Sequence, residues 1–249
     1  MSSDTAAFLT AKWYQLAMLN YEIDPKVLQP LVPAGTELDN WRGRTYASVV
    51  GFLFLDTRVL GVPIPYHRNF EEVNLRFYVR RKGSEGWRRA VVFVKEIVPR
   101  SAIAWLARAV YGENYVALPM RHSVGLEYDT GAGARSVSYS WWFRGGENRM
   151  EITVGGNPEE AAEGSAEEFI TEHYWGYARR RDGRTTEYRV DHPRWRVLNA
   201  RVARLDCDVA GVYGRQFVEF LQSPASAFLA DGSEVTVFKG ALVAGLRGK

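Results

Sequence analysis

Apolar and polar residues alternate along one stretch of this chain with the two-residue period of a strand that has two different faces. One face of the segment 73–80 is apolar and carries Val73, Leu75, Phe77 and Val79. The other face is polar and carries Asn74, Arg76, Tyr78 and Arg80. The polar face borders either solvent or a polar cavity wall. In the second case Arg76 would suit a carboxylate ligand, because a guanidinium pairs with a carboxylate through two hydrogen bonds.

Apolar runs that end at turn residues predict strands along most of the chain. The predicted segments are 12–19, 45–56, 73–80, 89–98, 120–128, 135–144, 148–154, 174–181, 185–190, 197–206 and 234–239. Capping residues predict short helices that begin near Asp24, Ser101 and Ser165, and the segment 61–65 is predicted to be a loop. This pattern indicates a mostly β (α+β) fold, with a large barrel or strongly bent sheet. Barrels of this size often enclose a ligand cavity.

Length and composition favour one folded domain over the whole chain. The 249 residues are 46% hydrophobic, and no linker, repeat or low-complexity run divides residues 1–249. The longest uncharged runs are too short for a membrane helix, so we expect no membrane partner. The segment 1–12 lacks the features of a secretory signal, and Cys207 is the only cysteine. The cytoplasm is therefore the expected compartment.

Charge and metal-ligand patterns exclude several classes of function. The net charge is +3, with 32 basic and 29 acidic side chains, and no nucleic-acid motif accompanies it. We expect no nucleic-acid partner. The four histidines lack the i,i+4 spacing of a helical metal pair, and one cysteine cannot build a thiolate zinc site. No metal and no cofactor is predicted.

The predicted strand 89–98 brings a charged residue to each of its faces. Lys95 shares a face with Val91, Phe93 and Ile97, and Glu96 lies on the opposite face. One of the two should point into the barrel, unless this end of the strand is exposed and both are solvated. A lysine inside a barrel would have a lowered pKa and could act as a base or form an imine. An inward Glu96 would instead contribute to ligand binding.

Six segments in order along the chain resemble one protein family. They are DPKVLQPLVP (24–33), TELD (36–39), FEEVNLRFYV (70–79), ARAVYG (107–112), FITEHY (169–174) and HPRW (192–195). Together they resemble the YqjF-like family of uncharacterised bacterial proteins, which is related to acetoacetate decarboxylase. The resemblance implies an acetoacetate-decarboxylase-like bent barrel with a central cavity. It also implies that the chain could form homo-oligomers.

The resemblance also suggests roles for individual residues. In the decarboxylase a lysine that follows a helix forms a Schiff base with the substrate, and here Tyr115 stands at that position. A phenol cannot form an imine with a ketone. The decarboxylase active-site glutamate corresponds to Glu72, and an arginine of its first strand corresponds to Lys12. An acid and a base are thus retained while the nucleophile is lost.

Three hypotheses for function follow. The first is binding of a small carboxylate or carbonyl compound by Lys12, Arg76, Glu72 and Glu96, with Tyr115 nearby. The second is a lyase, hydratase or isomerase that uses Tyr115 and Glu72, or Lys95 as a relocated amine. The third is an interaction protein whose cavity is filled by aromatic side chains.

Overall fold

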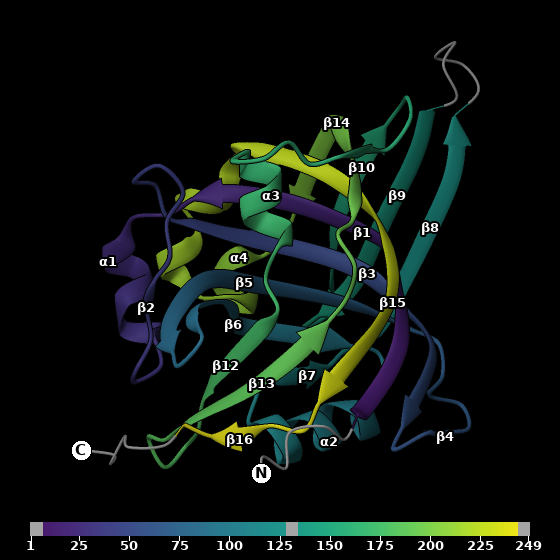
Figure 1. Cartoon of the computed structure of the whole chain (residues 1–249). Helices are drawn as coiled ribbons and strands as arrows, with labels where there is room; N and C mark the ends of the chain where they lie inside the picture. Colours follow the sequence, from purple (N-terminus) through teal and green to yellow (C-terminus); the bar gives the residue numbers. More distant parts are fainter. Residues whose placement is uncertain (1–6, 128–133, 244–249) are drawn as a thin grey trace.

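Seven strands of the chain close into a barrel (Figure 1). The computed structural model describes residues 7–127 and 134–243. In their order around the barrel the strands are β13 (Thr185–Asp191), β12 (Trp175–Arg179), β6 (Gly86–Val98), β5 (Phe70–Gly83), β3 (Tyr46–Val59), β1 (Ala7–Glu22) and β15 (Ser226–Phe238). Neighbours are antiparallel except β12 and β6. Pairing of β13 with β15 closes the ring.

A second group of strands branches from β15 and covers one outer side of the barrel. It consists of β14 (Arg196–Asp206), β10 (Gly146–Val154), β9 (Ala134–Phe143) and β8 (Met120–Glu127). These strands can approach β3 because Gly51 has no side chain. A Cβ there would lie 2.5 Å from Cδ2 of Tyr139 and 2.7 Å from Sδ of Met150. The Tyr139 hydroxyl also donates a 2.8 Å hydrogen bond to the Gln15 carbonyl of β1.

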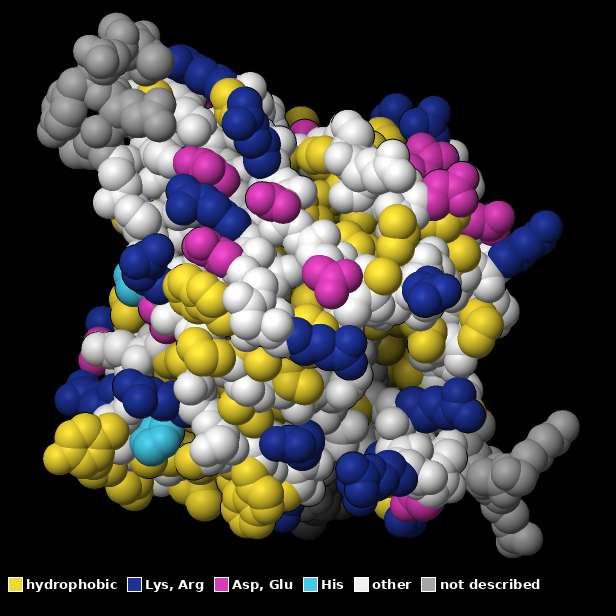
Figure 2. Space-filling model, turned by 180° about the vertical axis from the view of Figure 1, so that it is seen from behind, with side chains coloured by type: hydrophobic (Ala, Val, Ile, Leu, Met, Phe, Trp, Pro, Cys, Tyr) yellow, Lys and Arg dark blue, Asp and Glu magenta, His cyan; other side chains and the backbone are white. Residues whose placement is uncertain are grey.

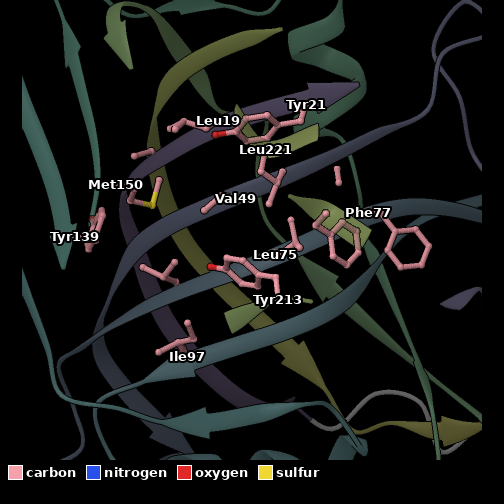
Figure 3. Close-up of a cluster of buried hydrophobic side chains, with 14 of the residues drawn as sticks. Leu19, Tyr21, Val49, Leu75, Phe77, Ile97, Tyr139, Met150, Tyr213 and Leu221 are labelled. Atoms are coloured by element: carbon pink, nitrogen blue, oxygen red, sulfur yellow. The ribbon is translucent and has the colours of Figure 1, made fainter. Parts of the chain in front are cut away.

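Three apolar clusters result from this arrangement. One lies between the barrel and the second group of strands, where Leu19, Val49, Leu75 and Ile97 project outward from the barrel (Figure 3). The other two lie inside the barrel and are rich in aromatic rings. On the surface opposite the view of Figure 1, acidic side chains lie mainly in the upper half, while Lys and Arg side chains occur over the whole face (Figure 2).

Short helices and two-residue strands complete the fold. The helices are α1 (Pro25–Leu28), α2 (Ser101–Tyr111), α3 (Ala166–Thr171) and α4 (Val209–Val212), with 3₁₀ turns η1 (Gln29–Leu31), η2 (Arg215–Phe217) and η3 (Phe220–Gln222). The remaining strands are β2 (Glu37–Leu38), β4 (Val62–Pro63), β7 (Tyr115–Ala117), β11 (Glu159–Glu160) and β16 (Ala241–Leu242). Helix α2 lies at the lower end of the barrel in Figure 1 and faces its interior. No helix in the described parts of the chain is long and apolar enough to cross a membrane.

The predicted mostly β fold is confirmed, and most predicted strands are present but longer. The largest difference is β15, which begins at Ser226 rather than at residue 234. The reason is Gly232, which looks like a turn residue but lies within the strand at a φ of 80°. A Cβ at this position would overlap the Trp13 carbonyl of β1. Ser101 is the first residue of α2 rather than its N-cap, which is Arg100.

Two smaller differences concern the ends of predicted elements. Val62 and Pro63, within the predicted loop 61–65, pair with β3 as the short strand β4. The predicted strand 120–128 ends in the structure at Glu127, and Tyr128 lies outside the described residues.

Candidate functional site

The barrel interior holds a cavity of about 130 Å³. Much of its wall is apolar and aromatic, with Trp13, Phe52, Phe54, Phe70 and Phe93 among the lining residues. The expectation of an interior filled by aromatic side chains is therefore not met. The polar part of the wall is smaller. It comes from β5, β6 and β7 and also includes Glu113, Thr171, His173, Tyr188 and His192.

The polar face of β5 is a wall of this cavity. Glu72, Asn74 and Arg76 all line it, as expected for alternate residues of one strand. Phe70 precedes them on the same face. Along β5 the inward side chains thus change from aromatic to carboxyl, amide and guanidinium. The alternation seen in the sequence correctly grouped Asn74 with Arg76, and the structure places both in the cavity wall. Arg80 of the same predicted face instead pairs with Glu37 at the surface.

Glu72 is 2% exposed and holds two hydrogen bonds. Asn74 Nδ2 donates to Oε1 over 2.9 Å, and the Tyr115 hydroxyl donates to Oε2 over 3.1 Å. Burial raises the pKa of Glu72 to about 7, while the two hydrogen bonds and the charge of Arg76 act in the opposite direction. Near neutral pH this carboxyl can therefore either accept or release a proton.

Tyr115 reaches the cavity from the strand that follows α2. The helix ends at Gly112, whose φ of 77° is the left-handed conformation common after a helix. The chain then enters β7, which pairs in parallel with β6 and places Tyr115 opposite Glu96. Burial of the hydroxyl, together with the nearby carboxyls of Glu72 and Glu96, raises the pKa of Tyr115 well above its usual value. The phenol is therefore a hydrogen-bond donor at neutral pH.

Strand β6 turns Glu96 inward and Lys95 outward because of a bulge. Asn74 pairs with Glu96 and Leu75 with Lys95, but Arg76 pairs with Phe93, so the register shifts by one residue at Val94. Strict alternation would have grouped Lys95 with Phe93. Instead Glu96 shares the cavity wall with Phe93 and Val91.

The expectation that Lys95 acts inside the cavity is thereby corrected. Its Nζ donates to the Val212 carbonyl of α4, on the outer side of the barrel. Burial lowers the pKa of this amine, but its side chain is not part of the cavity wall. The corresponding expectation for Glu96 is met in position, because this carboxyl is 2% exposed and lines the cavity.

Lys12 also lies outside the cavity, contrary to expectation. Its neighbour Trp13 points inward, so Lys12 projects to the other side of β1. The amine forms an ion pair with Asp56 at 3.3 Å and lies 4.0 Å from Glu234. Among the described residues, no lysine side chain lines the cavity.

A third buried carboxyl, Glu113, was not predicted from the sequence. It is 6% exposed and accepts a 2.9 Å hydrogen bond from the Tyr188 hydroxyl of β13. Burial raises the pKa of Glu113 to about 8. The spacing of the sequence could have identified Glu113, because it precedes Tyr115 by two residues. Alternate residues of an extended segment lie on the same face. Burial and the charges of Glu113 and Glu72 raise the pKa of Glu96 as well.

Arg76, His173 and His192 form the basic part of the wall. Arg76 Nη2 lies 3.4 Å from the Ile170 carbonyl, and its guanidinium lies 5.7 Å from the centre of the Tyr78 ring. His173, from the segment after α3, is 6% exposed. Burial and the charges of Arg89 and Arg76 lower its pKa well below the usual value, so the imidazole is neutral. No spacing in the sequence identified His173.

Several buried polar atoms of the cavity wall lack a hydrogen-bond partner among the described residues. They are Asn74 Oδ1, Glu96 Oε2, Arg76 Nε, Trp13 Nε1 and both ring nitrogens of His173. Buried polar atoms are usually paired, so these atoms are suited to a polar ligand. Within residues 7–127 and 134–243, no group of three or more His, Cys, Asp or Glu side chains is arranged to hold a metal ion.

Solved structures of three enzymes are similar to nearly the whole chain. The enduracididine biosynthesis enzyme MppR has a TM-score of 0.69 and 12% identity, over 96% of this chain and 88% of that chain. An acetoacetate decarboxylase-like enzyme from Sphingomonas wittichii RW1 has a TM-score of 0.65 and 13% identity, over 96% and 94%. Acetoacetate decarboxylase from Legionella pneumophila subsp. pneumophila str. Philadelphia 1 also has 0.65 and 13%, over 98% and 90%. The fold is thus acetoacetate-decarboxylase-like.

Sequence comparison agrees with this similarity. The chain is 36% identical over 75 residues to the uncharacterized protein YqjF of Bacillus subtilis (strain 168). This alignment covers 30% of this chain and 31% of YqjF, so it spans about a third of that relative. The model of the DUF2071 family, described as an uncharacterized conserved protein, matches residues 10–234. The resemblance to a YqjF-like family with this fold is therefore confirmed.

Proposed function

This chain belongs to the DUF2071 family, and we propose that it binds a small carboxylate or carbonyl compound inside its barrel. The observation that carries the proposal is the convergence of Arg76, Asn74 and Glu96 on one cavity, each with a polar atom that lacks a partner among the described residues. A guanidinium suits a carboxylate. An amide and a protonated carboxyl beside it suit a carbonyl or hydroxyl group.

The fold relative MppR supports this choice of ligand. One structure of that enzyme is described as complexed with pyruvate. Its identity to this chain is 13%, so the likeness covers the fold, and the ligand remains part of our proposal. Pyruvate and acetoacetate are therefore reasonable first probes.

The proposed chemistry does not involve a lysine imine. By resemblance Tyr115 stands where the decarboxylase carries its Schiff-base lysine. The nearest candidate for a relocated amine, Lys95, contacts Val212 on the outer side of the barrel. We expect the cavity to hold its ligand without a covalent bond to the protein.

Titration of the purified protein with pyruvate and acetoacetate tests this function. Calorimetry or protein-observed NMR should detect saturable binding, and Arg76→Gln should weaken it about tenfold or more, because a hydrogen-bonded charge pair is lost. Arg58→Gln is the matched control, since Arg58 is exposed on β3. Equal affinity of the Arg76→Gln and Arg58→Gln proteins would contradict a carboxylate site at Arg76. Absence of binding by every acid tested would overturn the proposed function.

A second candidate function is enzymatic proton transfer, and the contact between Tyr115 and Glu72 favours it. Their 3.1 Å hydrogen bond joins a donor and a carboxyl whose pKa is about 7. A carbonyl compound beside this pair could lose an α-proton from carbon to Glu72, while the C–H electron pair moves into an enolate whose oxygen accepts from Tyr115. Such a step belongs to isomerases, hydratases and lyases.

Proton exchange into solvent tests the second function separately from binding. In deuterated water the enzyme should replace the α-hydrogens of a bound oxo acid with deuterium, which proton NMR detects as loss of signal. Glu72→Gln should abolish this exchange while the acid still binds. Binding without exchange in the unaltered protein would leave the first function and refute the second.

A further inference from the structure

The cavity wall brings two hydrogen-bond acceptors without partners next to an arginine. Resting on the proposed function, we infer that the ligand is a small α-amino acid, whose ammonium group lies between Asn74 and Glu96 and whose carboxylate faces Arg76. The inference narrows the proposed carboxylate ligands to those that also carry a cationic nitrogen. Pyruvate, which has a carbonyl oxygen in place of that nitrogen, is then the weaker ligand.

The two acceptors are register partners on neighbouring strands. Asn74 of β5 pairs with Glu96 of β6, and both side chains line the cavity at 2% exposure. Opposite residues on one face of an antiparallel pair have Cβ atoms about 4.5–5.5 Å apart, so these side chains border the same small volume. Asn74 Oδ1 and Glu96 Oε2 both lack a hydrogen-bond partner among the described residues. One donor group between them could bond to both.

The hydrogen bonds already present favour a donor on the ligand. Asn74 Nδ2 donates to Glu72 Oε1 over 2.9 Å, which leaves Oδ1 as the acceptor of this amide. The Tyr115 hydroxyl donates to Glu72 Oε2 over 3.1 Å. The oxo group of pyruvate can only accept hydrogen bonds, so it would leave Asn74 Oδ1 unpaired, and buried polar atoms are usually paired. An ammonium group has three N–H donors, enough to bond to both acceptors at once.

Arg76 lies one step along β5 from these acceptors. It follows Asn74 by two residues on the same inward face, a separation of roughly 6.6 Å. Its Nε lacks a partner among the described residues, and its charge lowers the pKa of Glu72, so the guanidinium lies near the carboxyl groups. An α-amino acid carries its ammonium and carboxylate on one carbon atom. Its two charged groups therefore suit an arginine and a pair of acceptors that are this close together.

The cavity volume suits a ligand of this size. An apolar cavity of about 150 Å³ holds one benzene molecule. The cavity here is about 130 Å³. Alanine and pyruvate each have as many non-hydrogen atoms as benzene, and both carry a carboxylate beside a methyl-bearing carbon. The two compounds therefore compare an amino group with an oxo group at nearly constant size.

The groups around Glu96 give binding of an amino acid a proton signature. Besides Arg76, the titratable groups that face Glu96 are Glu72 of β5, Tyr115 of β7, Glu113 before β7 and Tyr188 of β13. Burial and the charges of Glu113 and Glu72 raise the pKa of Glu96 well above its usual value, so the free protein holds a proton there. An ammonium group beside Glu96 favours the carboxylate, so the O–H bond breaks and the proton passes to the buffer. Pyruvate brings no cation and should release no proton.

Calorimetric titration of alanine and pyruvate against the same protein tests the inference. Alanine should bind about tenfold more tightly, because it gains hydrogen bonds to a charged group. Titrations near neutral pH in phosphate and in Tris, whose ionisation enthalpies differ, should show release of about one proton with alanine and none with pyruvate. Glu96→Gln should abolish the proton release and the preference for alanine. Glu160→Gln is the matched control, because Glu160 is exposed on β11.

The outcomes separate this inference from the proposed function. If pyruvate binds as tightly as alanine, or if alanine binds without releasing a proton, the inference fails while the carboxylate site stands. Both comparisons use the unaltered protein and do not depend on the folding of a variant. Equal affinity of the Glu96→Gln and Glu160→Gln proteins for alanine would also overturn the inference. If alanine, pyruvate and acetoacetate all fail to bind, the proposed function fails as well.

Discussion

The Tyr188 ring occupies the space above Gly176, its register partner on the neighbouring strand. The ring can lie there only because Gly176 has no Cβ, since a Cβ at this position would overlap the Tyr188 ring. In this position the hydroxyl reaches Glu113 at 2.9 Å. The absence of a side chain at Gly176 thus leaves the space in which Tyr188 can donate a hydrogen bond to the buried carboxyl of Glu113.

Gly176→Ala is therefore expected to displace Tyr188 and to destabilise the fold by about 1–3 kcal/mol, as overpacking does. Urea denaturation measures the loss. Gly125→Ala is the matched strand control, because a Cβ at Gly125 meets no atom of the described residues within 4 Å. Combining Gly176→Ala with Tyr188→Leu should cost less than the sum of the single changes. Additive costs would show that the ring and the glycine do not interact as described.

The buried carboxyl of Glu113 predicts a pH dependence of stability. Its pKa is about 8 in the folded protein, against an ordinary value of 4.5. Between these values the folded form retains a proton that the unfolded chain has released, so the free energy of unfolding falls as pH rises from about 4.5 to 8. Glu113→Gln should remove about 1.4 kcal/mol of this fall for each pH unit between these two values.

Urea denaturation at several pH values between 5 and 8 measures this effect. Glu160→Gln provides the control, because Glu160 is exposed on β11. Parallel pH profiles for Glu113→Gln and the unaltered protein would contradict a raised pKa at Glu113.

Removing the Tyr115 hydroxyl should change the titration of Glu72. The hydrogen bond from Tyr115 favours the ionised carboxylate and lowers the pKa of Glu72 against the effect of burial. Tyr115→Phe should therefore move the midpoint of Glu72 titration upward by about one pH unit. Carbon NMR of the Glu72 carboxyl, assigned with Glu72→Gln, measures the midpoint. Tyr66→Phe is the control, because Tyr66 is 90% exposed. An unchanged midpoint would refute the contact.

Lys95 should contribute to stability rather than to chemistry. Lys95→Met removes the hydrogen bond to the Val212 carbonyl and should cost about 1 kcal/mol in urea denaturation. Affinity for oxo acids should stay unchanged, and borohydride added with pyruvate or acetoacetate should leave the protein mass unaltered. Lys82→Met serves as the exposed control. A borohydride-trapped adduct on Lys95 would show that this amine forms an imine with the ligand, and it would contradict a purely stabilising role.

The sequence was most informative where strands are regular. Alternation along β5 correctly placed Asn74 and Arg76 on one face, because no bulge interrupts that strand between them. The resemblance drew attention to Glu72 and Tyr115, and the fold brings these two side chains to a 3.1 Å contact. That contact joins β5 to β7 across β6, and a pairing between distant segments leaves no periodic signal in the chain.

Bulges explain where the sequence was less informative. The shift at Val94 reverses the relation of Lys95 to Phe93. A second irregularity lies at Gln15, whose φ is 56°, and it lets Trp13 and Leu16 both line the cavity although they are three residues apart. Neither bulge has a marker in the hydrophobic pattern. His173 and Tyr188 were missed because their roles depend on the closure of the barrel.

The joint between β13 and β15 closes the barrel through only two residue pairs, Val190 with Val237 and Asp191 with Thr236. Val190 and Val237 also line the cavity. This short joint, which has no more residue pairs than the joint between β12 and β6, is therefore part of the cavity wall. Local separation of β13 and β15 would widen the route between the cavity and solvent without unfolding the remaining sheet. Amide hydrogen exchange at Asp191 and Thr236 should accordingly be faster than in β3 and should slow when a ligand binds. Ligand entry would then depend on local opening of this one short strand pair.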